Sequence, residues 1–231
     1  MTAGDAGRVS AIVAVRDGER YLGETLDSIL GQSAPPGEVV VVDDGSTDAT
    51  RATLEPDAGR VRVVAQEPEG VAAALNRGIA TSTGELLAFL DADDVWPPTS
   101  LECRLTRLAA PDGPEAVFGR IAQFVSPELG QDAARTFRFD PAPAHAPMFQ
   151  TMLIERTAFD RVGPLATDYV IGANIDWVSR GRAARVRTAH VEDVVALRRL
   201  HGSNLGVTER RRQTADLVRV VRAHRRRKLS T

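Results

Sequence analysis

The sequence predicts an α/β fold in which a mainly parallel central sheet is flanked by helices, with a further helix at the C-terminus. Two observations support this class. Short runs of apolar, β-branched residues alternate with helical segments through about the first ninety residues, an order typical of parallel strands joined by helical crossovers. Several of these runs also end in acidic residues, and open parallel sheets bind their ligands at the carboxyl ends of the strands.

Four strands are expected in the first half, because each run is short, apolar and rich in valine or leucine, as buried parallel strands are. They are Val9–Val15, Glu38–Val42, Val61–Ala65 and Glu85–Leu90. Apolar residues at helical spacing predict helices over 21–30 and 71–80. The segment Asp43–Asp48 combines turn-forming residues with a helix N-cap pattern.

The second half predicts elements that are spaced further apart. Strands are expected at Ala116–Ile121 and Thr151–Ile154, helices at Glu155–Val162 and Ile175–Ala184, and either a strand or a loop at Val194–Leu200. A long helix is expected over Glu209–Lys228, with Leu217, Val220 and Val221 packing on the body or on a second chain. We therefore divide the chain into a main domain, 1–208, and a basic tail, 209–231.

Composition excludes several classes of protein. With 231 residues, 43% hydrophobic and 26% charged, the chain predicts one globular domain and not a disordered segment. The single cysteine, Cys103, permits neither an internal disulfide nor a cysteine-based zinc cluster. No apolar run approaches the roughly 20 residues that span a bilayer, and the N-terminus does not resemble a signal peptide. We expect a cytoplasmic location.

Charge is distributed unevenly along the chain. Residues 210–231 carry a net charge of +8 and the rest of the chain −10, within a total of −2. An acidic body is atypical of nucleic-acid-binding proteins, so we expect no nucleic-acid partner for it. The basic tail is compatible with a peripheral membrane contact, another anionic partner or self-association, and equally with a solvated helix face.

Acidic residues gather where two of the expected strands end. Asp43 and Asp44 follow the second strand, and Asp91-Ala92-Asp93-Asp94 follows the fourth. The carboxylates would repel one another at a shared rim, and a divalent cation would relieve that repulsion. For the first pair, taken alone, a capped turn is the favoured explanation, whereas three acids within four residues favour a functional site.

Other phosphate-binding classes lack their motifs here. The chain has no Gly-x-x-x-x-Gly-Lys-Ser/Thr and no Gly-x-Gly-x-x-Gly after the first strand, which argues against P-loop NTPases and dinucleotide oxidoreductases. A phosphatase with an aspartyl nucleophile would need a lysine, and the only lysine is Lys228. A sugar-phosphate nucleotidyltransferase would need a glycine-rich loop after the first strand, where Ala14–Arg20 stands instead.

Several blocks, taken together and in order, resemble family 2 glycosyltransferases of the GT-A fold. In the first hundred residues these are residues 9–22, 26–32, 39–48, 76–78 and 86–94. In the second half the blocks 152–156, 159–165, 174–177 and 199–204 match more loosely. Three positions depart from the family pattern: Asp17 replaces a usual Asn, Leu75 a common Arg, and Ile175 the acid before Asp176.

The resemblance implies roles for individual residues. It implies that Asp176 is the base that deprotonates the acceptor, and that Asp93 and His201 approach a divalent metal, Mn²⁺ or Mg²⁺; for His201 an ordinary loop histidine is an even alternative. The residues implied to bind the nucleotide-sugar are Ala14, Val15, Arg16, Asp44, Asp91, Ala92 and Asp93. Residues 1–98 would then bind the donor and 99–208 the acceptor.

The function implied is a metal-dependent, inverting glycosyl transfer from a nucleoside-diphosphate sugar, with a UDP-sugar as the expected donor and an acceptor that the sequence does not identify. Two alternatives stay open. One is an inactive module that keeps the nucleotide-sugar pocket without turnover. The other is a piece of a membrane-bound polysaccharide synthase, which would need membrane helices and a Gln-x-x-Arg-Trp segment that this sequence does not contain.

Overall fold

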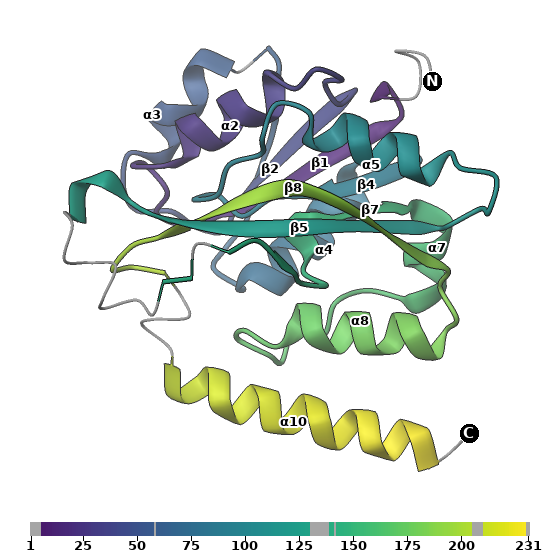
Figure 1. Ribbon diagram of the computed structural model, residues 1–231. Helices are drawn as coiled ribbons and strands as arrows, with labels where there is room; N and C mark the ends of the chain where they lie inside the picture. The colour runs from purple at the N-terminus through teal and green to yellow at the C-terminus, as the bar shows by residue number, and fades with distance from the viewer. Residues whose placement is uncertain (1–5, 58, 130–138, 141, 205–209, 230–231) are drawn as a thin grey trace.

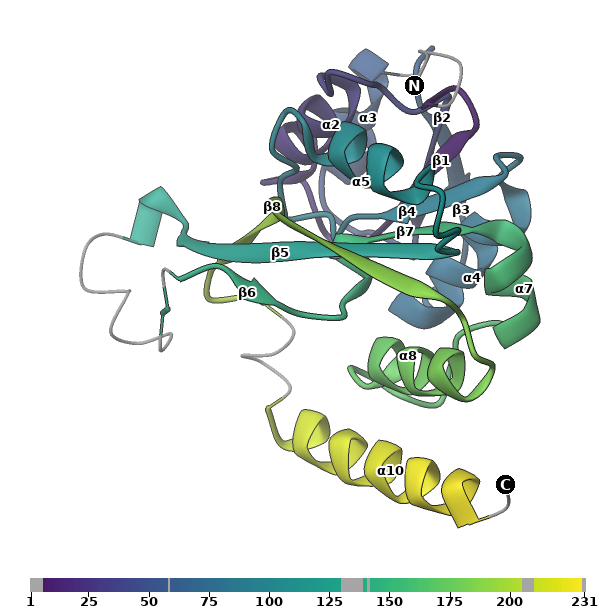
Figure 2. The ribbon, with the colours of Figure 1, turned by 45° about the vertical axis from the view of Figure 1, so that its right-hand side comes forward.

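The computed structural model describes residues 6–57, 59–129, 139–140, 142–204 and 210–229. Its centre is a mixed sheet with helices on both faces, and the last helix lies at one edge of the molecule in both views (Figures 1 and 2). The sheet has eight strands, in the order β3-β2-β1-β4-β7-β5-β6, with β8 paired to β5. The predicted α/β class is therefore confirmed.

The N-terminal half of the sheet is parallel, as predicted. Its strands are β1 (Val9–Val15), β2 (Glu38–Asp43), β3 (Arg62–Ala65) and β4 (Leu86–Phe89). Strand β1 lies between β2 and β4, and β3 lies outside β2, with all three pairs parallel. Because these strands point the same way, the residues that follow β1, β2 and β4 share one rim of the sheet.

The second half makes the sheet mixed. Its strands are β5 (Ala116–Val125), β6 (Ala144–His145), β7 (Met152–Glu155) and β8 (Thr188–Leu200). Strand β7 is antiparallel to β4 and to β5, β6 is antiparallel to β5, and only the β5–β8 pair is parallel. Strand β7 begins beside the end of β4. The residues just before β7 therefore lie at the same rim as those that follow β4. The segment 194–200, for which a strand and a loop were both expected, is the end of β8.

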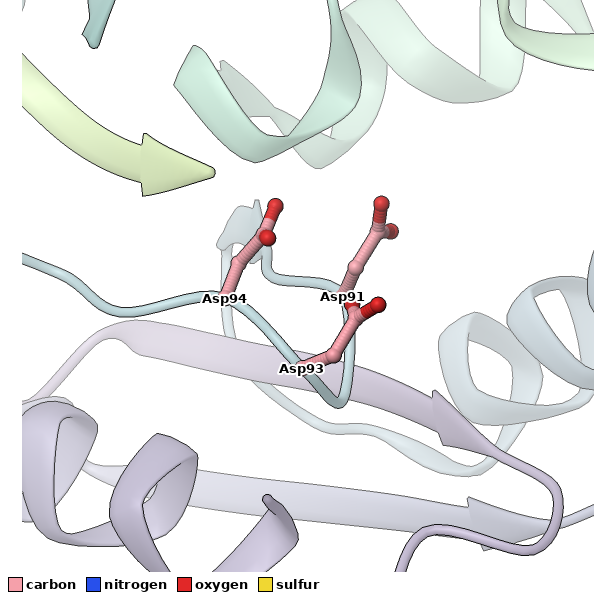
Figure 3. Close-up of side chains that lie close together, drawn as sticks. All are labelled: Asp91, Asp93 and Asp94. Atoms are coloured by element: carbon pink, nitrogen blue, oxygen red, sulfur yellow. The ribbon is translucent and has the colours of Figure 1, made fainter. Parts of the chain in front are cut away.

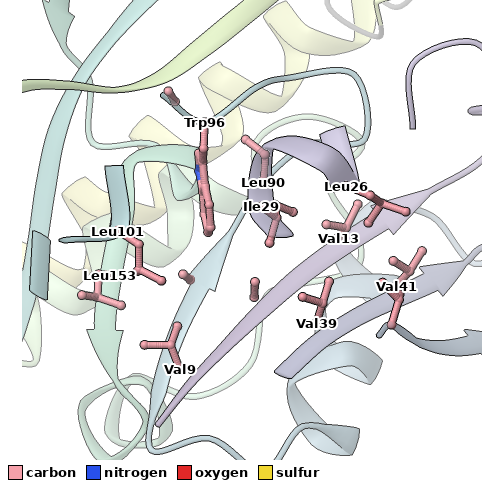
Figure 4. Packing of buried hydrophobic residues seen from close by; sticks show 14 of the residues in the cluster. Val9, Val13, Leu26, Ile29, Val39, Val41, Leu90, Trp96, Leu101 and Leu153 are labelled. Atoms are coloured by element: carbon pink, nitrogen blue, oxygen red, sulfur yellow. The ribbon is translucent and has the colours of Figure 1, made fainter. Parts of the chain in front are cut away.

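Helices cover the two faces of the sheet in separate sets. Helices α2 (Leu22–Leu30), α3 (Thr50–Leu54) and α5 (Ser100–Leu108) lie on one face, and α4 (Val71–Thr81), α7 (Arg156–Val162) and α8 (Ala173–Ala183) on the other. The first face is packed by Leu26, Ile29, Trp96 and Leu101 against valines of β1 and β2 (Figure 4). Short 3₁₀ turns at Glu55–Asp57, Pro127–Leu129 and Phe149–Thr151 complete the connections.

The C-terminal helix α10 (Arg210–Leu229) contacts α8 and the loop before it. Val220 is 3% exposed, whereas Leu217 and Val221 are 40% and 50% exposed. Of these three residues, Val220 therefore packs on the body and Leu217 and Val221 do not; the alternative that they pack on a second chain stays a prediction. Asp216 fastens the helix instead, because its carboxylate accepts hydrogen bonds from the backbone of Val170 and Ile171. Among the described residues no helix is long and apolar enough to cross a membrane.

Candidate active site

A tight turn after β4 brings three carboxylates together. The backbone N–H of Asp94 donates to the carbonyl oxygen of Asp91 at 3.1 Å, which closes the turn. One oxygen from each of Asp91, Asp93 and Asp94 then lies within 4.8 Å of the others (Figure 3). The sequence pattern favoured a functional site for these three acids, and the family resemblance implied roles for Asp91 and Asp93; in the structure the carboxylate of Asp94 lies in the same cluster.

The cluster is electrostatically strained without a cation. Asp91 is exposed to solvent, but the protein around its carboxylate displaces much of the water that would hydrate it. This desolvation, together with the smaller effect of the negative charge of Asp93, raises the pKa of Asp91 to about 6. Burial and both neighbouring carboxylates raise the pKa of Asp94 well above its usual range. The Oδ2 atom of Asp94 is buried and has no hydrogen-bond partner. Crowded oxygen ligands with an unpartnered atom fit a hard divalent cation.

The segment 199–204 closes over this turn. His201 Nε2 lies 2.8 Å from Asp93 Oδ2, and the Asn204 side-chain amide donates to the same oxygen at 2.9 Å. The guanidinium of Arg199 donates to the Asp93 carbonyl oxygen, and the Arg199 backbone N–H donates to Asp94 Oδ1, both at 3.0 Å. The structure thus brings the predicted pair Asp93 and His201 together, with His201 only 6% exposed.

Aromatic side chains support this closing segment. The Tyr21 ring lies 4.6 Å from the His201 ring, and the Arg199 guanidinium lies 4.8 Å from the Tyr21 ring centre. On its other side Arg199 lies over Phe124 at 4.6 Å and pairs with Glu24. The sequence indicated no role for Tyr21 at this site, although Tyr21 lies within the first block that resembles the family, residues 9–22.

Gln150 is a second residue that sequence reasoning missed. It is 4% exposed, and its side-chain amide donates to Asp91 Oδ2. The indole N–H of Trp96 in turn donates to the Gln150 carbonyl oxygen at 3.4 Å. Gln150 therefore orients the first acid of the cluster from a segment that precedes β7, far from it in the sequence.

The predicted nucleotide-binding residues lie along the same rim. Asp44 is 4% exposed, and its carboxylate accepts hydrogen bonds from Gln66 Nε2 and from the backbone N–H groups of Glu69 and Gly70, at 2.7–2.8 Å. It thereby ties the loop before α4 to the end of β2. The residues at the end of β1 differ: Ala14 is half-buried, Val15 is buried and Arg16 is exposed, and Ala92 is half-buried beside the acids.

Asp176 lies in the first turn of α8 and is 4% exposed. Its Oδ2 atom accepts a hydrogen bond from Arg180 Nε at 2.8 Å. The two terminal nitrogens of Arg180 donate to the carbonyl oxygens of Val162 and Pro164 at 2.8 and 2.7 Å, and the Trp177 indole donates to Gly163 at 2.8 Å. Together these contacts bind α8 to the end of α7.

Comparisons with known proteins agree with this architecture. Residues 10–163 match the model of glycosyl transferase family 2. The putative glycosyltransferase EpsH of Bacillus subtilis is 33% identical over 138 residues, covering 58% of this chain and 40% of that protein. The putative teichuronic acid biosynthesis glycosyltransferase TuaG of the same organism is 40% identical over 101 residues, covering 42% of this chain and 40% of that protein. The chain spans about two fifths of the length of these relatives.

Two solved structures resemble most of the chain. The mannosyltransferase PcManGT from Pyrobaculum calidifontis, in complex with GDP-Man and Mn²⁺, has a TM-score of 0.69 and 26% identity, covering 94% of this chain and 64% of that one. Residues 1–349 of S. aureus TarS, in complex with UDP, have a TM-score of 0.71 and 17% identity, covering 95% of this chain and 64% of that one. The second likeness establishes the fold alone.

Proposed function

We propose that this chain, which belongs to glycosyl transferase family 2, transfers a sugar from a nucleoside-diphosphate sugar to an acceptor nucleophile. The observation that carries the proposal is the cluster of Asp91, Asp93 and Asp94 at the carboxyl end of a parallel strand, with the buried Oδ2 of Asp94 unpartnered. Diphosphate groups and hard cations are bound together by such oxygen-rich sites, and open α/β sheets bind nucleotides at this rim.

We propose that the acids hold Mn²⁺ or Mg²⁺ and that the reaction depends on this ion. Asp93 is the main proposed ligand, with His201 beside it: Nε2 and Oδ2 are 2.8 Å apart, so both could contact one ion once Nε2 carries no hydrogen. Bound there, the ion would stabilise the negative charge that develops on the departing diphosphate. The complex of PcManGT with GDP-Man and Mn²⁺ supports this proposal by similarity.

We propose that the nucleotide lies along the ends of β1 and β2. Ala14, Val15 and Arg16 would line it, Asp44 would stand at the base, and Asp91, Ala92 and Asp93 would stand at the ribose and diphosphate. A UDP-sugar is the proposed donor, with GDP-sugars as the competing outcome, since the structural neighbours include complexes with both nucleotides. Residues 1–98 would then form the donor half and 99–208 the acceptor half.

Asp176 is the proposed acceptor base, and direct displacement would invert the configuration of the sugar carbon. General-base catalysis of this kind is typically worth about 10²–10⁴-fold in rate. One observation favours the second candidate function, an inactive module that only binds nucleotide-sugars: Asp176 Oδ2 is already engaged by Arg180 at 2.8 Å. The two candidates share the donor site and differ in whether transfer occurs.

A thermal-shift panel of UDP- and GDP-sugars, each with and without Mn²⁺, tests the shared donor site. A ligand present at 100 times its dissociation constant adds about 2.7 kcal/mol of apparent stability, which corresponds to a rise of roughly 5–10 °C for a chain of this size. We expect the unfolding temperature to rise by this amount with either the UDP-sugars or the GDP-sugars, and only when Mn²⁺ is present. If no nucleotide-sugar shifts the transition, the proposed function is wrong.

A further inference from the structure

Two adjacent arginines at the end of β8 have opposite environments. Arg199 is 3% exposed and fully engaged by Glu24, the Asp93 carbonyl oxygen and two aromatic rings. Arg198 is half-buried, and within the described parts of the chain no carboxylate lies within ion-pair distance of its guanidinium. The two neighbouring guanidinium groups therefore differ, because a carboxylate neutralises that of Arg199 and none neutralises that of Arg198 within the described residues.

The backbone places Arg198 against the acidic turn. On one side of it, Leu197 exchanges two backbone hydrogen bonds with Val95, at 2.8 and 3.0 Å. On the other side, the Arg199 N–H donates to Asp94 Oδ1 at 3.0 Å. Strand β8 ends next to Asp94 in the close-up (Figure 3). Because side chains alternate along a strand, Arg198 points away from the ring stack that holds Arg199.

Electrostatics agrees with this placement. The positive charge of Arg198 lowers the pKa of both Asp91 and Asp94, opposing the burial and carboxylate charges that raise them. The guanidinium therefore acts on both acids, although it pairs with neither of them.

We propose that Arg198 binds the diphosphate of the nucleotide-sugar and stabilises it as it departs. The inference rests on the proposed function. Three carboxylates repel a diphosphate, and a second cation beside the ion would reduce that repulsion. The only lysine, Lys228, is in the C-terminal helix, so an arginine must supply that charge, and a guanidinium forms two parallel hydrogen bonds to a phosphate group.

Calorimetric titration of UDP and GDP, with Mn²⁺ present, into the parent chain and into Arg198→Gln tests the proposal. Arg198→Gln removes the proposed hydrogen bonds to a charged phosphate group. We therefore expect this variant to bind the diphosphate about 10- to 100-fold more weakly than the parent chain. The loss should be smaller for UMP and GMP, which lack the second phosphate. Arg198→Lys keeps the positive charge but lacks the planar guanidinium. Its diphosphate affinity should lie between those of the parent chain and of Arg198→Gln.

Arg107→Gln is the matched control. Arg107 forms an exposed ion pair with Asp112 near the end of α5. Its substitution also removes one positive charge, but away from the acidic turn. Diphosphate affinity should be unchanged. If the parent chain binds neither UDP nor GDP, the proposed function and this inference both fail. If the parent binds one of them and Arg198→Gln binds it equally well, only this inference fails.

A purely structural role for Arg198 gives a different result. Arg198→Gln would then lower the unfolding temperature and weaken diphosphate and monophosphate by the same factor, which would overturn the proposal. Should Arg198→Gln fail to fold, Arg198→Lys decides. A loss of affinity that is larger for the diphosphates than for the monophosphates would support the proposal, whereas unchanged affinity or an equal loss for both would overturn it.

Discussion

Asp93 and Asp94 are adjacent in sequence but differ in what their carboxylates contact. Asp93 Oδ2 accepts hydrogen bonds from two side chains, His201 and Asn204, at 2.8 and 2.9 Å. Asp94 Oδ1 accepts one from a backbone N–H, and its Oδ2 accepts none. The first carboxylate is oriented by its neighbours toward the rim, whereas the second is buried in the turn. Substitutions at the two positions should therefore differ in their effect on stability when no metal is bound.

Asp93→Ala should abolish metal-dependent nucleotide binding, because it removes the proposed main ligand of the ion. Calorimetry with UDP or GDP and Mn²⁺ measures this. Asp94→Asn is the comparison: it removes one of three carboxylates whose oxygens lie within 4.8 Å, so we expect a higher unfolding temperature without metal. Unchanged nucleotide affinity in Asp93→Ala would exclude Asp93 as the ligand.

Asp176→Asn should reduce stability whatever the catalytic role of Asp176, because the side chains of Asp176 and Arg180 are only 6% and 22% exposed. Removing one partner of a buried ion pair costs about 3–5 kcal/mol, and partial exposure of Arg180 brings our expectation down to about 2 kcal/mol. Urea unfolding measures that loss. If Asp176 is the base, transfer to the acceptor should also fall by two or more orders of magnitude.

Arg180→Gln is the matched variant for that experiment. It breaks the same ion pair but leaves the carboxylate of Asp176 in place. Transfer that falls far more in Asp176→Asn than in Arg180→Gln, at similar stability, identifies a base. Equal losses of transfer in the two variants would mean that the pair only fastens α8 to the end of α7.

At the scale of elements, the start of α2 is linked to the end of β5. The Tyr21 hydroxyl donates to Glu128, and the Ser126 hydroxyl donates to the other oxygen of the same carboxylate at 2.6 Å. These hydrogen bonds lower the pKa of Glu128 to about 2, and the one from Ser126 has the largest effect. Because the Tyr21 ring also contacts His201, this link supports the segment that closes over the acidic turn.

The Glu128 link should therefore be sensitive to acid. A carboxyl whose pKa is lowered in the folded state stabilises the fold above its unfolded value, near 4.5, and loses that contribution as the pH falls toward 2. We expect the unfolding temperature of the parent to exceed that of Glu128→Gln by a constant amount from pH 7 to 5. The difference should shrink between pH 4.5 and 3. A difference that grows on acidification would contradict the assignment.

The elements that the sequence predicted are those whose signal is local. Strands β1 to β4 and helix α4 agree with expectation to within one or two residues, because a run of apolar residues or a helical period is complete within each. The antiparallel direction of β7 depends on its pairing with β4 and β5, which no local pattern specifies. The same reason applies to the site: Gln150 contacts Asp91 across 59 positions, and Arg199 contacts Asp93 across 106.

Over the whole molecule, opposite charges are separated in space. The residues before 210 carry −10 and those from 210 onward +8, and α10 lies at the edge of the molecule, outside α8 (Figure 2). The exposed side of α10 also presents Leu217, Val218 and Val221, each at least 40% exposed. A basic helix with an exposed apolar strip is the arrangement that binds anionic bilayer surfaces, so we propose such a surface as the contact of α10.

Vesicle flotation tests this last proposal. Each basic residue near an anionic surface is worth about 1 kcal/mol, so we expect the chain to float with vesicles that contain phosphatidylserine at low salt, and to be released at high salt because ions screen the attraction. Replacing residues 225–228, which are all basic, by glutamine should abolish flotation without changing nucleotide affinity, since the described contacts of α10 are with α8 and the loop before it. Leu217→Ser with Val221→Ser should weaken flotation at constant charge. If the parent chain instead stays with the soluble fraction and sediments as a dimer that this double variant dissociates, the apolar strip joins two copies of the chain and the proposed membrane contact is wrong.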